Sequence, residues 1–238
     1  MAEDRYLPAP ELVVFDLAGT TIRDRGEVPA AFVEALAGAS IVVEPAAITR
    51  WRGASKREAL NHLVAAARPD LGAGDRAMLV ASTYRTFCDA LTTRLTATPD
   101  LAFPGALPTF ERLRQAGIRL ALNSGFDRAL VAAIVEATGW PLDLFDAVVS
   151  GDDVEAGRPA PDMIFVCMEA AGVRDATRVA VVGDTRLDLE AGLNAGAGWR
   201  IGVLTGAHDR ATLERAPYTH IVASVGDVPE LWRWDSLS

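Results

Sequence analysis

The stretch that decides the fold is Glu11-Leu12-Val13-Val14-Phe15-Asp16-Leu17-Ala18-Gly19-Thr20-Thr21. Its continuous apolar run, ending at Phe15, is typical of a short strand buried on both faces of a parallel sheet. Asp16 closes this predicted strand, and open parallel sheets bind their ligands at the carboxyl ends of the strands. The stretch therefore predicts a central strand that carries a carboxylate into a binding site.

Beyond residue 98 the chain alternates between apolar runs and helical patterns. The apolar runs lie at 118–123, 146–149, 178–183, 200–204 and 219–223. The helical patterns lie at 106–116, 127–137, 161–171 and 187–195. Strands separated by helices of this length favour right-handed crossovers and a parallel sheet with helices on both faces. We expect an α/β fold with a Rossmann-like, doubly wound parallel sheet as its core.

One region interrupts this alternation. Residues 28–96 are alanine-rich, with apolar residues spaced three or four apart and no convincing strand. Segments that contain Gly and Pro flank the region at 24–29 and 98–105, which is typical of linkers. We predict an α-helical cap domain, residues 23–98, inserted into a core made of residues 1–22 and 99–238.

Composition narrows the classes of function. The chain has 238 residues, half of them apolar, and a formal net charge of -9. Without a basic stripe, nucleic acid is not an expected partner. Cys88 and Cys167 lie far apart, which fits a reducing compartment. Residues 1–10 carry acidic residues and no long apolar segment, which argues against a signal peptide or a membrane helix. We expect a cytoplasmic protein.

Polar residues follow several of the predicted strands on one sheet edge. They are Asp16, Ser124 with Gly125, Arg158, and Asp184 with Asp188. Each has an ordinary structural explanation, because Gly-Asp after a strand is often a helix cap, Ser-Gly is a common turn and Gly-Arg-Pro can be a loop. Their shared position at one edge favours a single functional site.

The chemistry that these residues suggest is phosphoryl transfer. Asp16, Asp184 and Asp188 offer the two or three carboxylates that Mg²⁺ accepts, with waters completing its coordination. Asp16 is also the candidate nucleophile, which would form an aspartyl-phosphate. Ser124 and the backbone N–H groups after it can hold phosphoryl oxygens, and Arg158 can neutralise negative charge.

The basic residues are distributed unusually. Of the 23 basic side chains, Lys56 is the only lysine. An arginine stays protonated and cannot act as an amine nucleophile, whereas a desolvated lysine can lose its proton and attack a carbonyl. We interpret Lys56 as a residue kept for chemistry. The alternative is a bias toward arginine that leaves one lysine on the surface.

Together these motifs resemble those of the haloacid dehalogenase superfamily. The motifs are Asp16-Leu17-Ala18-Gly19-Thr20-Thr21, Ser124-Gly125, Gly157-Arg158-Pro159-Ala160-Pro161, and Gly183-Asp184-Thr185 through Asp188. The resemblance covers nearly the whole chain, including the cap after the first strand. It implies a Mg²⁺ site at Asp16, Ala18, Asp184 and Asp188.

Three features look like the phosphonoacetaldehyde hydrolase (phosphonatase) branch. Most phosphatases of the superfamily have a second Asp where this chain has Ala18, and a Lys where it has Arg158. The phosphonatase cap carries a lysine three residues after a glycine, as Gly53 and Lys56 do here. In that family the lysine forms an imine with an aldehyde β to phosphorus, and C–P cleavage then releases an enamine. The resemblance implies catalytic roles for Asp16, Lys56, Ser124 and Arg158, and substrate binding by Gly53, Ser124, Gly125 and Arg158.

The chain departs from the phosphonatase pattern at four positions. Phe126 replaces a Tyr, Ala59 a His, Arg52 a Met and Gly26 a Cys. The lost His and Tyr are candidates for proton transfer at the imine and for positioning the substrate. We therefore expect a phosphonatase-like hydrolase whose small-molecule substrate is phosphonoacetaldehyde or a related oxo-alkylphosphonate.

Three alternatives remain at this point. A phosphomonoesterase is disfavoured by Ala18, because losing a general acid typically lowers the rate about 10²–10⁴-fold. Haloacid dehalogenation needs no metal, which the pair Asp184 and Asp188 argues against. A cap-and-core binding module without activity would seldom retain all of these residues. The sequence leaves open a homodimer formed through the cap.

Overall fold

The central element is a sheet of six parallel strands. The structure, a computed structural model, describes residues 9–51 and 54–232. The strands are β1 (Leu12–Asp16), β2 (Arg119–Asn123), β3 (Ala147–Val149), β4 (Val179–Gly183), β5 (Trp199–Val203) and β6 (His220–Val222). Their order is β3-β2-β1-β4-β5-β6, so β1 lies between β2 and β4. All five residues of β1 are buried, as the opening apolar run predicts.

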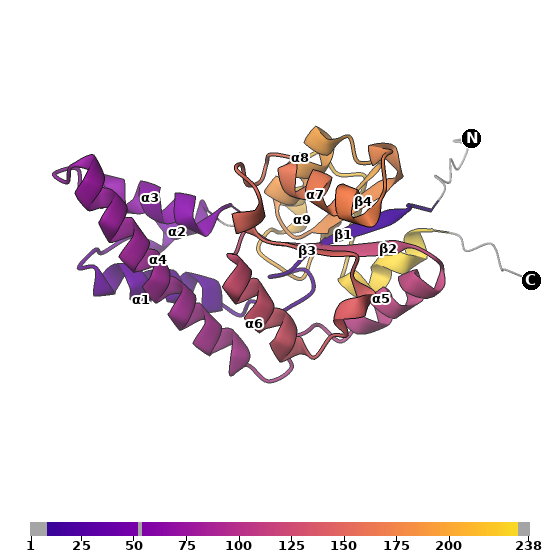
Figure 1. Cartoon of the computed structure of the whole chain (residues 1–238), viewed down its shortest axis with the longest axis horizontal. Coiled ribbons are helices and arrows are strands. Elements are labelled where there is room, and N and C mark those ends of the chain that lie inside the picture. The colour runs from indigo at the N-terminus through magenta and orange to yellow at the C-terminus, as the bar shows by residue number, and fades with distance from the viewer. Residues whose placement is uncertain (1–8, 52–53, 233–238) are drawn as a thin grey trace, which may run out of the picture.

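Helices cover both faces of this sheet. They are α5 (Ala106–Gln115), α6 (Arg128–Thr138), α7 (Asp162–Ala171), α8 (Arg186–Ala195) and α9 (Arg210–Leu213), with short 3₁₀ helices η1 (Leu142–Leu144), η2 (Gly151–Asp153), η3 (Ala176–Arg178) and η4 (Val225–Leu231). Val13 and Phe15 join the core cluster that contains residues of α5 and α6. Leu12 and Val14 join the other cluster, with residues of α7 and α8. These two helices lie across the sheet from α5 and α6 (Figure 1). The predicted α/β doubly wound fold is confirmed, and each predicted strand and helix of the core lies within one residue of its expected bounds.

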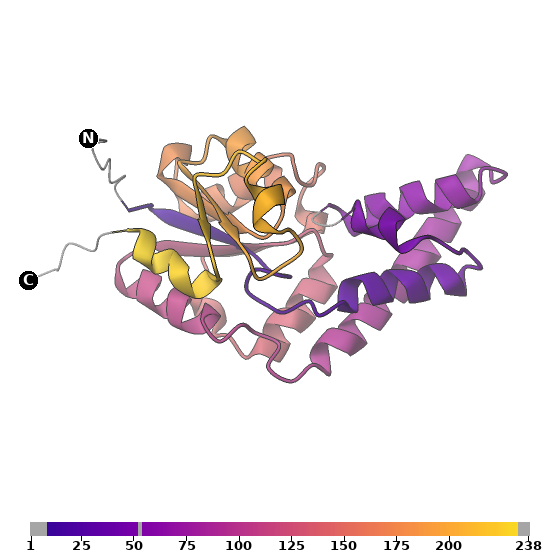
Figure 2. The same ribbon diagram turned by 180° about the vertical axis from the view of Figure 1, so that it is seen from behind.

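The region after β1 is helical, as predicted. It contains α1 (Glu27–Gly38), α2 (Pro45–Thr49), α3 (Lys56–Ala67) and α4 (Ala73–Thr96), and no strand among its described residues. These helices stand together to one side of the sheet in both views (Figures 1 and 2). They share apolar contacts such as Phe32 against Phe87, whose ring centroids lie 4.5 Å apart. The domain boundaries near residues 22 and 98 stay a prediction.

The two segments that connect the sheet to the helical region, around residues 21–23 and 101–103, lie side by side. The N–H of Arg23 donates to the carbonyl of Leu101 at 2.8 Å, and the N–H of Phe103 donates to the carbonyl of Thr21 at 3.0 Å. The Arg23 guanidinium also donates to the carbonyl of Ala102 at 2.5 Å. These bonds hold the two connections in a fixed register, which sets where α1–α4 lie relative to the end of β1.

The longest helix is α4, with 24 residues. Neither it nor any other helix in the described part of the chain combines the length and apolar composition needed to cross a membrane.

Candidate active site

The predicted site residues meet at the carboxyl edge of the sheet. Asp16 ends β1, Ser124 follows β2 and Asp184 follows β4, and these three strands are neighbours. A cavity of about 80 Å³ opens there. Its lining includes Asp16, Ala18, Lys56, Ser124, Gly125, Arg158 and Asp184. Thus residues spread over most of the sequence converge on one small cavity, as the sequence predicts; Gly53 and Arg52 lie outside the described residues.

Arg158 is held between two carboxylates. Its Nη1 lies 2.7 Å from Oδ1 of Asp16 and 2.7 Å from Oδ1 of Asp188. Its Nη2 donates to both oxygens of Asn123, the backbone carbonyl at 3.1 Å and the side-chain oxygen more closely. The Arg158 side chain is only 3% exposed, so these bonds fix its position beside Asp16. Nothing in the sequence pattern singled out Asn123, whose partner lies 35 residues away.

Asp188 holds the start of α8. Its Oδ2 accepts from the N–H of Thr185 at 3.0 Å and from the Thr185 hydroxyl at 2.5 Å, forming a capping box. Its Oδ1 faces Arg158. Both oxygens therefore have partners, and these contacts position Arg158 and helix α8. Direct coordination of a metal by Asp188 stays a prediction.

Asp16 and Asp184 are buried carboxylates, and the pKa of each is raised. Burial is the largest cause that raises the pKa of Asp16 to about 6; Arg158 opposes the shift and Asp188 adds to it. Burial, Asp16 and Asp188 together raise the pKa of Asp184 well above its usual value. The backbone N–H of Ala207 donates to Oδ2 of Asp184 at 2.5 Å. The site thus concentrates negative charge where water is largely excluded.

Two loops close tightly over Asp184. Gly19 has φ +90°, and a Cβ on it would lie 2.4 Å from Oδ2 of Asp184. A Cβ on Gly206 would lie 2.0 Å from the same oxygen. The Thr205 hydroxyl donates to the carbonyl of Gly19 at 2.7 Å and joins the two loops. A side chain is excluded at both glycines, because backbone must approach the carboxylate here. The segment 205–207 follows a predicted strand at the same edge, and that position was the available sequence signal for it.

This donor set fits Mg²⁺. Mg²⁺ is usually held by one or two carboxylates with several waters, and buried like charges are relieved by a cation. Asp16 and Asp184 supply two such carboxylates, and Ala18 lies beside them in the cavity lining. No three His, Cys, Asp or Glu side chains in the described part form a ready metal cluster. The fit therefore rests on Asp16 and Asp184; Ala18 and Asp188 as ligands stay predictions.

Lys56 is buried against this cavity. It is the first residue of α3, after the N-cap Ser55 whose Oγ accepts from the N–H of Glu58 at 3.4 Å. Its Nζ donates to the carbonyl of Ala54 at 2.9 Å and lies 5.5 Å from the centre of the Phe126 ring. Lys56 is 7% exposed. A leftover lysine on the surface is therefore excluded.

The surroundings of Lys56 lower its pKa to about 8. Burial is the largest cause, because it disfavours the charged form; Asp16 raises the pKa and Arg158 lowers it. A lysine that attacks a carbonyl must lose its proton, so a lowered pKa fits that role. Burial lowers the pKa of Lys56 more than the neighbouring Arg158 does. The ammonium group is thus easier to deprotonate than an exposed one.

The replaced phosphonatase positions Phe126 and Ala59 hold side chains that cannot donate or accept a proton in catalysis. Phe126 is buried, with its ring near the ammonium group, and Ala59 is fully buried on α3. His62, also on α3, stacks on Trp51 instead, with ring centroids 4.6 Å apart. No imidazole or phenol therefore takes either position.

Ser124 and Gly125 form the turn after β2. The Ser124 N–H donates to the carbonyl of Val149 at 2.9 Å, and its Oγ accepts from the N–H of Phe126 at 3.3 Å. The hydroxyl hydrogen of Ser124 has no acceptor among the described residues, so it can turn toward a ligand oxygen in the cavity.

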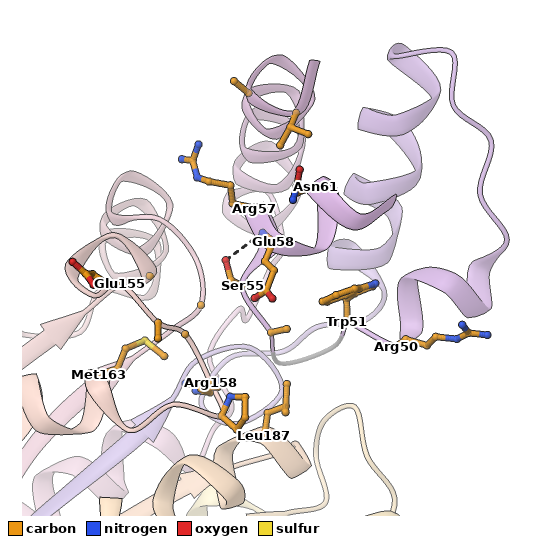
Figure 3. Close-up of a pocket in the computed structure, with 18 of the residues that line it drawn as sticks. Arg50, Trp51, Ser55, Arg57, Glu58, Asn61, Glu155, Arg158, Met163 and Leu187 are labelled. Carbon is orange, nitrogen blue, oxygen red and sulfur yellow. Dashed lines mark hydrogen bonds between the residues drawn. The ribbon is translucent and has the colours of Figure 1, made fainter. Parts of the chain in front are cut away.

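A larger chamber of about 920 Å³ adjoins the small cavity. The two share Gly125 and Arg158 in their linings. Figure 3 shows Arg57 and Asn61 of α3 on one side of it and Glu155 and Met163 on the other. The chamber gives a small molecule a route to the buried carboxylates.

Comparison with known families now decides the superfamily. A family model for haloacid dehalogenase-like hydrolases matches residues 10–196, which is most of the chain. The chain belongs to the haloacid dehalogenase-like hydrolase family. The predicted superfamily and hydrolase class are confirmed, and a binding module without activity is disfavoured.

Two relatives of this chain carry names that describe different activities. A phosphonoacetaldehyde hydrolase from Latilactobacillus sakei is 33% identical over 198 residues, which cover 78% of this chain and 72% of the relative. The probable phosphatase IndB of Dickeya dadantii is 31% identical over 220 residues, which cover 91% of each. The solved structure of a phosphonoacetaldehyde hydrolase-like protein from Oleispira antarctica shares the fold, with a TM-score of 0.79 at 23% identity over 97% of this chain and 94% of that one.

Proposed function

We propose that this hydrolase cleaves the C–P bond of phosphonoacetaldehyde or a related oxo-alkylphosphonate. One observation carries the proposal: Lys56, a buried amine of lowered pKa, lines the same small cavity as the carboxylate of Asp16. An imine at Lys56 and an aspartyl-phosphate at Asp16 are the two covalent steps that such a pair can perform. The phosphonoacetaldehyde hydrolase relative supports the same reaction.

The imine at Lys56 weakens the C–P bond. Nζ attacks the aldehyde carbon, water leaves and a protonated imine forms, which draws electrons from the neighbouring carbon. An apolar wall is useful here, because the Phe126 ring excludes water and tolerates the positive charge of the iminium. This step needs no acid at position 18, where Ala18 stands.

The phosphoryl group then passes to Asp16. A carboxylate oxygen forms an O–P bond as the C–P pair moves into the C=C bond of an enamine, and the C=N π pair returns to nitrogen. Arg158 keeps Asp16 in place and neutralises charge that develops on the phosphoryl oxygens, and Ser124 can donate to one of them. Mg²⁺ held by Asp16 and Asp184 would supply further neutralisation of that charge.

Two hydrolytic steps restore the protein. Water attacks the aspartyl-phosphate, which releases phosphate and regenerates Asp16. The enamine takes up a proton on carbon, and hydrolysis of the resulting imine releases the aldehyde product from Lys56. We propose that this enzyme acts in the cytoplasm, as the sequence predicts. A homodimer formed through the cap is compatible with this function.

A phosphomonoesterase is the second candidate, because the probable phosphatase from Dickeya dadantii matches over 91% of the chain. Its alcohol leaving group would need a proton donor, and Ala18, which cannot donate a proton, is the residue in the cavity lining two positions after Asp16. That geometry favours the oxo-alkylphosphonate.

The decisive experiment traps the imine. Borohydride added with phosphonoacetaldehyde or a longer oxo-alkylphosphonate should inactivate the enzyme and label the peptide that contains Lys56. Since Lys56 is the only lysine, the N-terminal amine is the one competing amine. Lys56→Arg keeps the charge and should abolish phosphate and aldehyde release. Asp16→Asn serves as the matched control, because it should still be labelled but release no phosphate.

Two results would contradict the proposal. The first is Lys56→Arg turning over an oxo-alkylphosphonate like the wild type, which would reduce the lysine to a positive charge. The second is wild-type hydrolysis of a phosphomonoester at ordinary enzymatic rates, about 1–10³ per second, with no labelling of Lys56.

A further inference from the structure

Asp24 is a carboxylate that the site described above does not use. It lies in the segment between β1 and α1, yet it lines the same cavity as Lys56. Asp16 and Asp184 line it too, but Asp16 is bonded to Arg158 and Asp184 to the N–H of Ala207. Asp24 is thus the carboxylate of this lining that is not engaged with Arg158 or with the loop at Ala207.

Backbone hydrogen bonds hold Asp24 in place. Its Oδ1 accepts from the N–H of Gly26 at 3.0 Å and from the N–H of Val28 at 3.2 Å, at the start of α1. Its Oδ2 accepts no hydrogen bond from the residues that the structure describes. The side chain is half-buried. One oxygen therefore anchors the group, and the other keeps its lone pairs unused within the described part of the chain.

Imine formation requires such a group. The ammonium of Lys56 must lose two protons, and the carbonyl oxygen of the substrate must gain two before it leaves as water. Among the described residues, Nζ donates to the Ala54 carbonyl and lies near the Phe126 ring, and neither group can carry a proton between these atoms. A positioned proton carrier contributes about 10²–10⁴-fold to such a step.

We propose that Asp24 carries protons from the Lys56 nitrogen to the carbonyl oxygen of the substrate. Asp24 takes one proton from the ammonium, and the freed nitrogen pair forms the C–N bond as the C=O π pair moves to oxygen. Asp24 then gives that proton to the oxygen. It takes a second proton from the positively charged nitrogen and delivers it to the hydroxyl as the C–O bond breaks. Water leaves, the nitrogen pair forms the C=N bond, and Asp24 is a carboxylate again.

The inference rests on the proposed function, and the test separates the two. Asp24→Asn removes the exchangeable proton but keeps an oxygen for the N–H groups of Gly26 and Val28. We expect the rate of borohydride trapping at Lys56, with saturating phosphonoacetaldehyde, to fall about 10²-fold or more. Glu27→Gln is the matched control: it changes a neighbouring carboxylate, which accepts from the N–H of Arg25 and does not line the cavity, and it should trap like the wild type.

A second variant tests the same role through rescue. Asp24→Ala opens space beside Lys56, and added formate should restore part of its trapping rate by supplying a small carboxylate. Trapping of Asp24→Asn as fast as the wild type would overturn the role of Asp24 while leaving the imine mechanism standing. No trapping in the wild type would overturn the imine, and the role of Asp24 with it. Formate without effect on a folded Asp24→Ala variant that traps slowly would also count against proton transfer.

Discussion

Lys56 is a cation that this fold buries. The difference between its ordinary pKa of 10.5 and about 8 corresponds to about 3 kcal/mol of disfavour for the charged form, an order-of-magnitude figure at about 1.36 kcal/mol per pKa unit. A lysine exposed to water would not carry this unfavourable free energy. Sites that bind or react commonly retain such unfavourable groups, and the cavity around Asp16 explains why this one is retained.

The pKa of Lys56 can be measured directly, because one lysine gives one signal. In protein labelled with ¹³C-lysine and kept free of Mg²⁺, we expect the side-chain NMR resonance to titrate near pH 8 rather than near 10.5. The amine is charged below that pH and neutral above it. Asp16→Asn should move the midpoint lower, because Asp16 raises the pKa of Lys56. A midpoint above pH 10 would show that Lys56 is solvated, and that result would contradict its burial.

At the scale of elements, a hydrogen bond connects α4 to the start of α6. The Cys88 thiol of α4 donates to Oδ2 of Asp127 at 2.9 Å, and burial and Asp127 raise the pKa of this thiol to about 12, so it stays protonated. Asp127 is also the N-cap of α6, accepting from the N–H of Leu130 at 2.8 Å. The next residue back is Phe126, against Lys56. This hydrogen bond therefore connects a helix of the inserted region to the loop beside the reactive amine.

A double-mutant cycle tests how much the hydrogen bond between Cys88 and Asp127 stabilises the fold. Cys88→Ala removes the thiol alone, whereas Asp127→Ala also removes a helix cap, which costs about 0.5–2 kcal/mol. Measured by urea unfolding, the two changes should be coupled by about 1 kcal/mol, since contacting residues are non-additive by about 0.5–3 kcal/mol. Thr86→Ala, which removes a hydroxyl bonded within α4, should combine additively with Asp127→Ala. Additive energies for Cys88 and Asp127 would mean that the thiol contact stabilises nothing.

The elements themselves were predictable because their signals are local. Apolar runs such as 178–183 and helical spacings such as 127–137 depend on neighbouring residues, and each predicted core element lies within one residue of the observed one. Asp16, Ser124, Arg158 and Asp184 were predictable as a set for a related reason: the ends of parallel strands must share an edge.

The contacts between those residues were not predictable. Arg158 reaches Asn123 across 35 residues, and Ala207 reaches Asp184 across 23. No periodic pattern records such pairs, because they depend on how loops approach one another in space. Asp24 was missed for the same reason: its place in the sequence suggests only a linker, whereas the fold returns it to the cavity of Lys56.

At the scale of the whole molecule, the site adds to an existing excess of negative charge. The chain has a formal net charge of -9, and Asp16 and Asp184 are buried beside one another. Burial raises the pKa of both carboxylates, and Asp16 raises the pKa of Asp184 further. The ionised pair therefore destabilises the folded protein unless a cation joins it. A metal ion that binds there should therefore stabilise the entire fold.

Mg²⁺ should accordingly raise the melting temperature. At about 100 times its dissociation constant, a ligand specific to the folded state adds about 2.7 kcal/mol, which for a chain of this size corresponds to roughly 5–10 °C. Asp184→Asn should melt higher than the wild type without Mg²⁺, because it removes one of the two repelling charges, and should lose most of the response to Mg²⁺. Asp143→Asn, at an exposed carboxylate, should keep that response. Melting curves at matched ionic strength distinguish binding from screening, since NaCl should not reproduce the shift. If Mg²⁺ raises the melting temperature of Asp184→Asn as much as that of the wild type, the metal binds elsewhere. The repulsion between Asp16 and Asp184 would then be unrelated to magnesium binding.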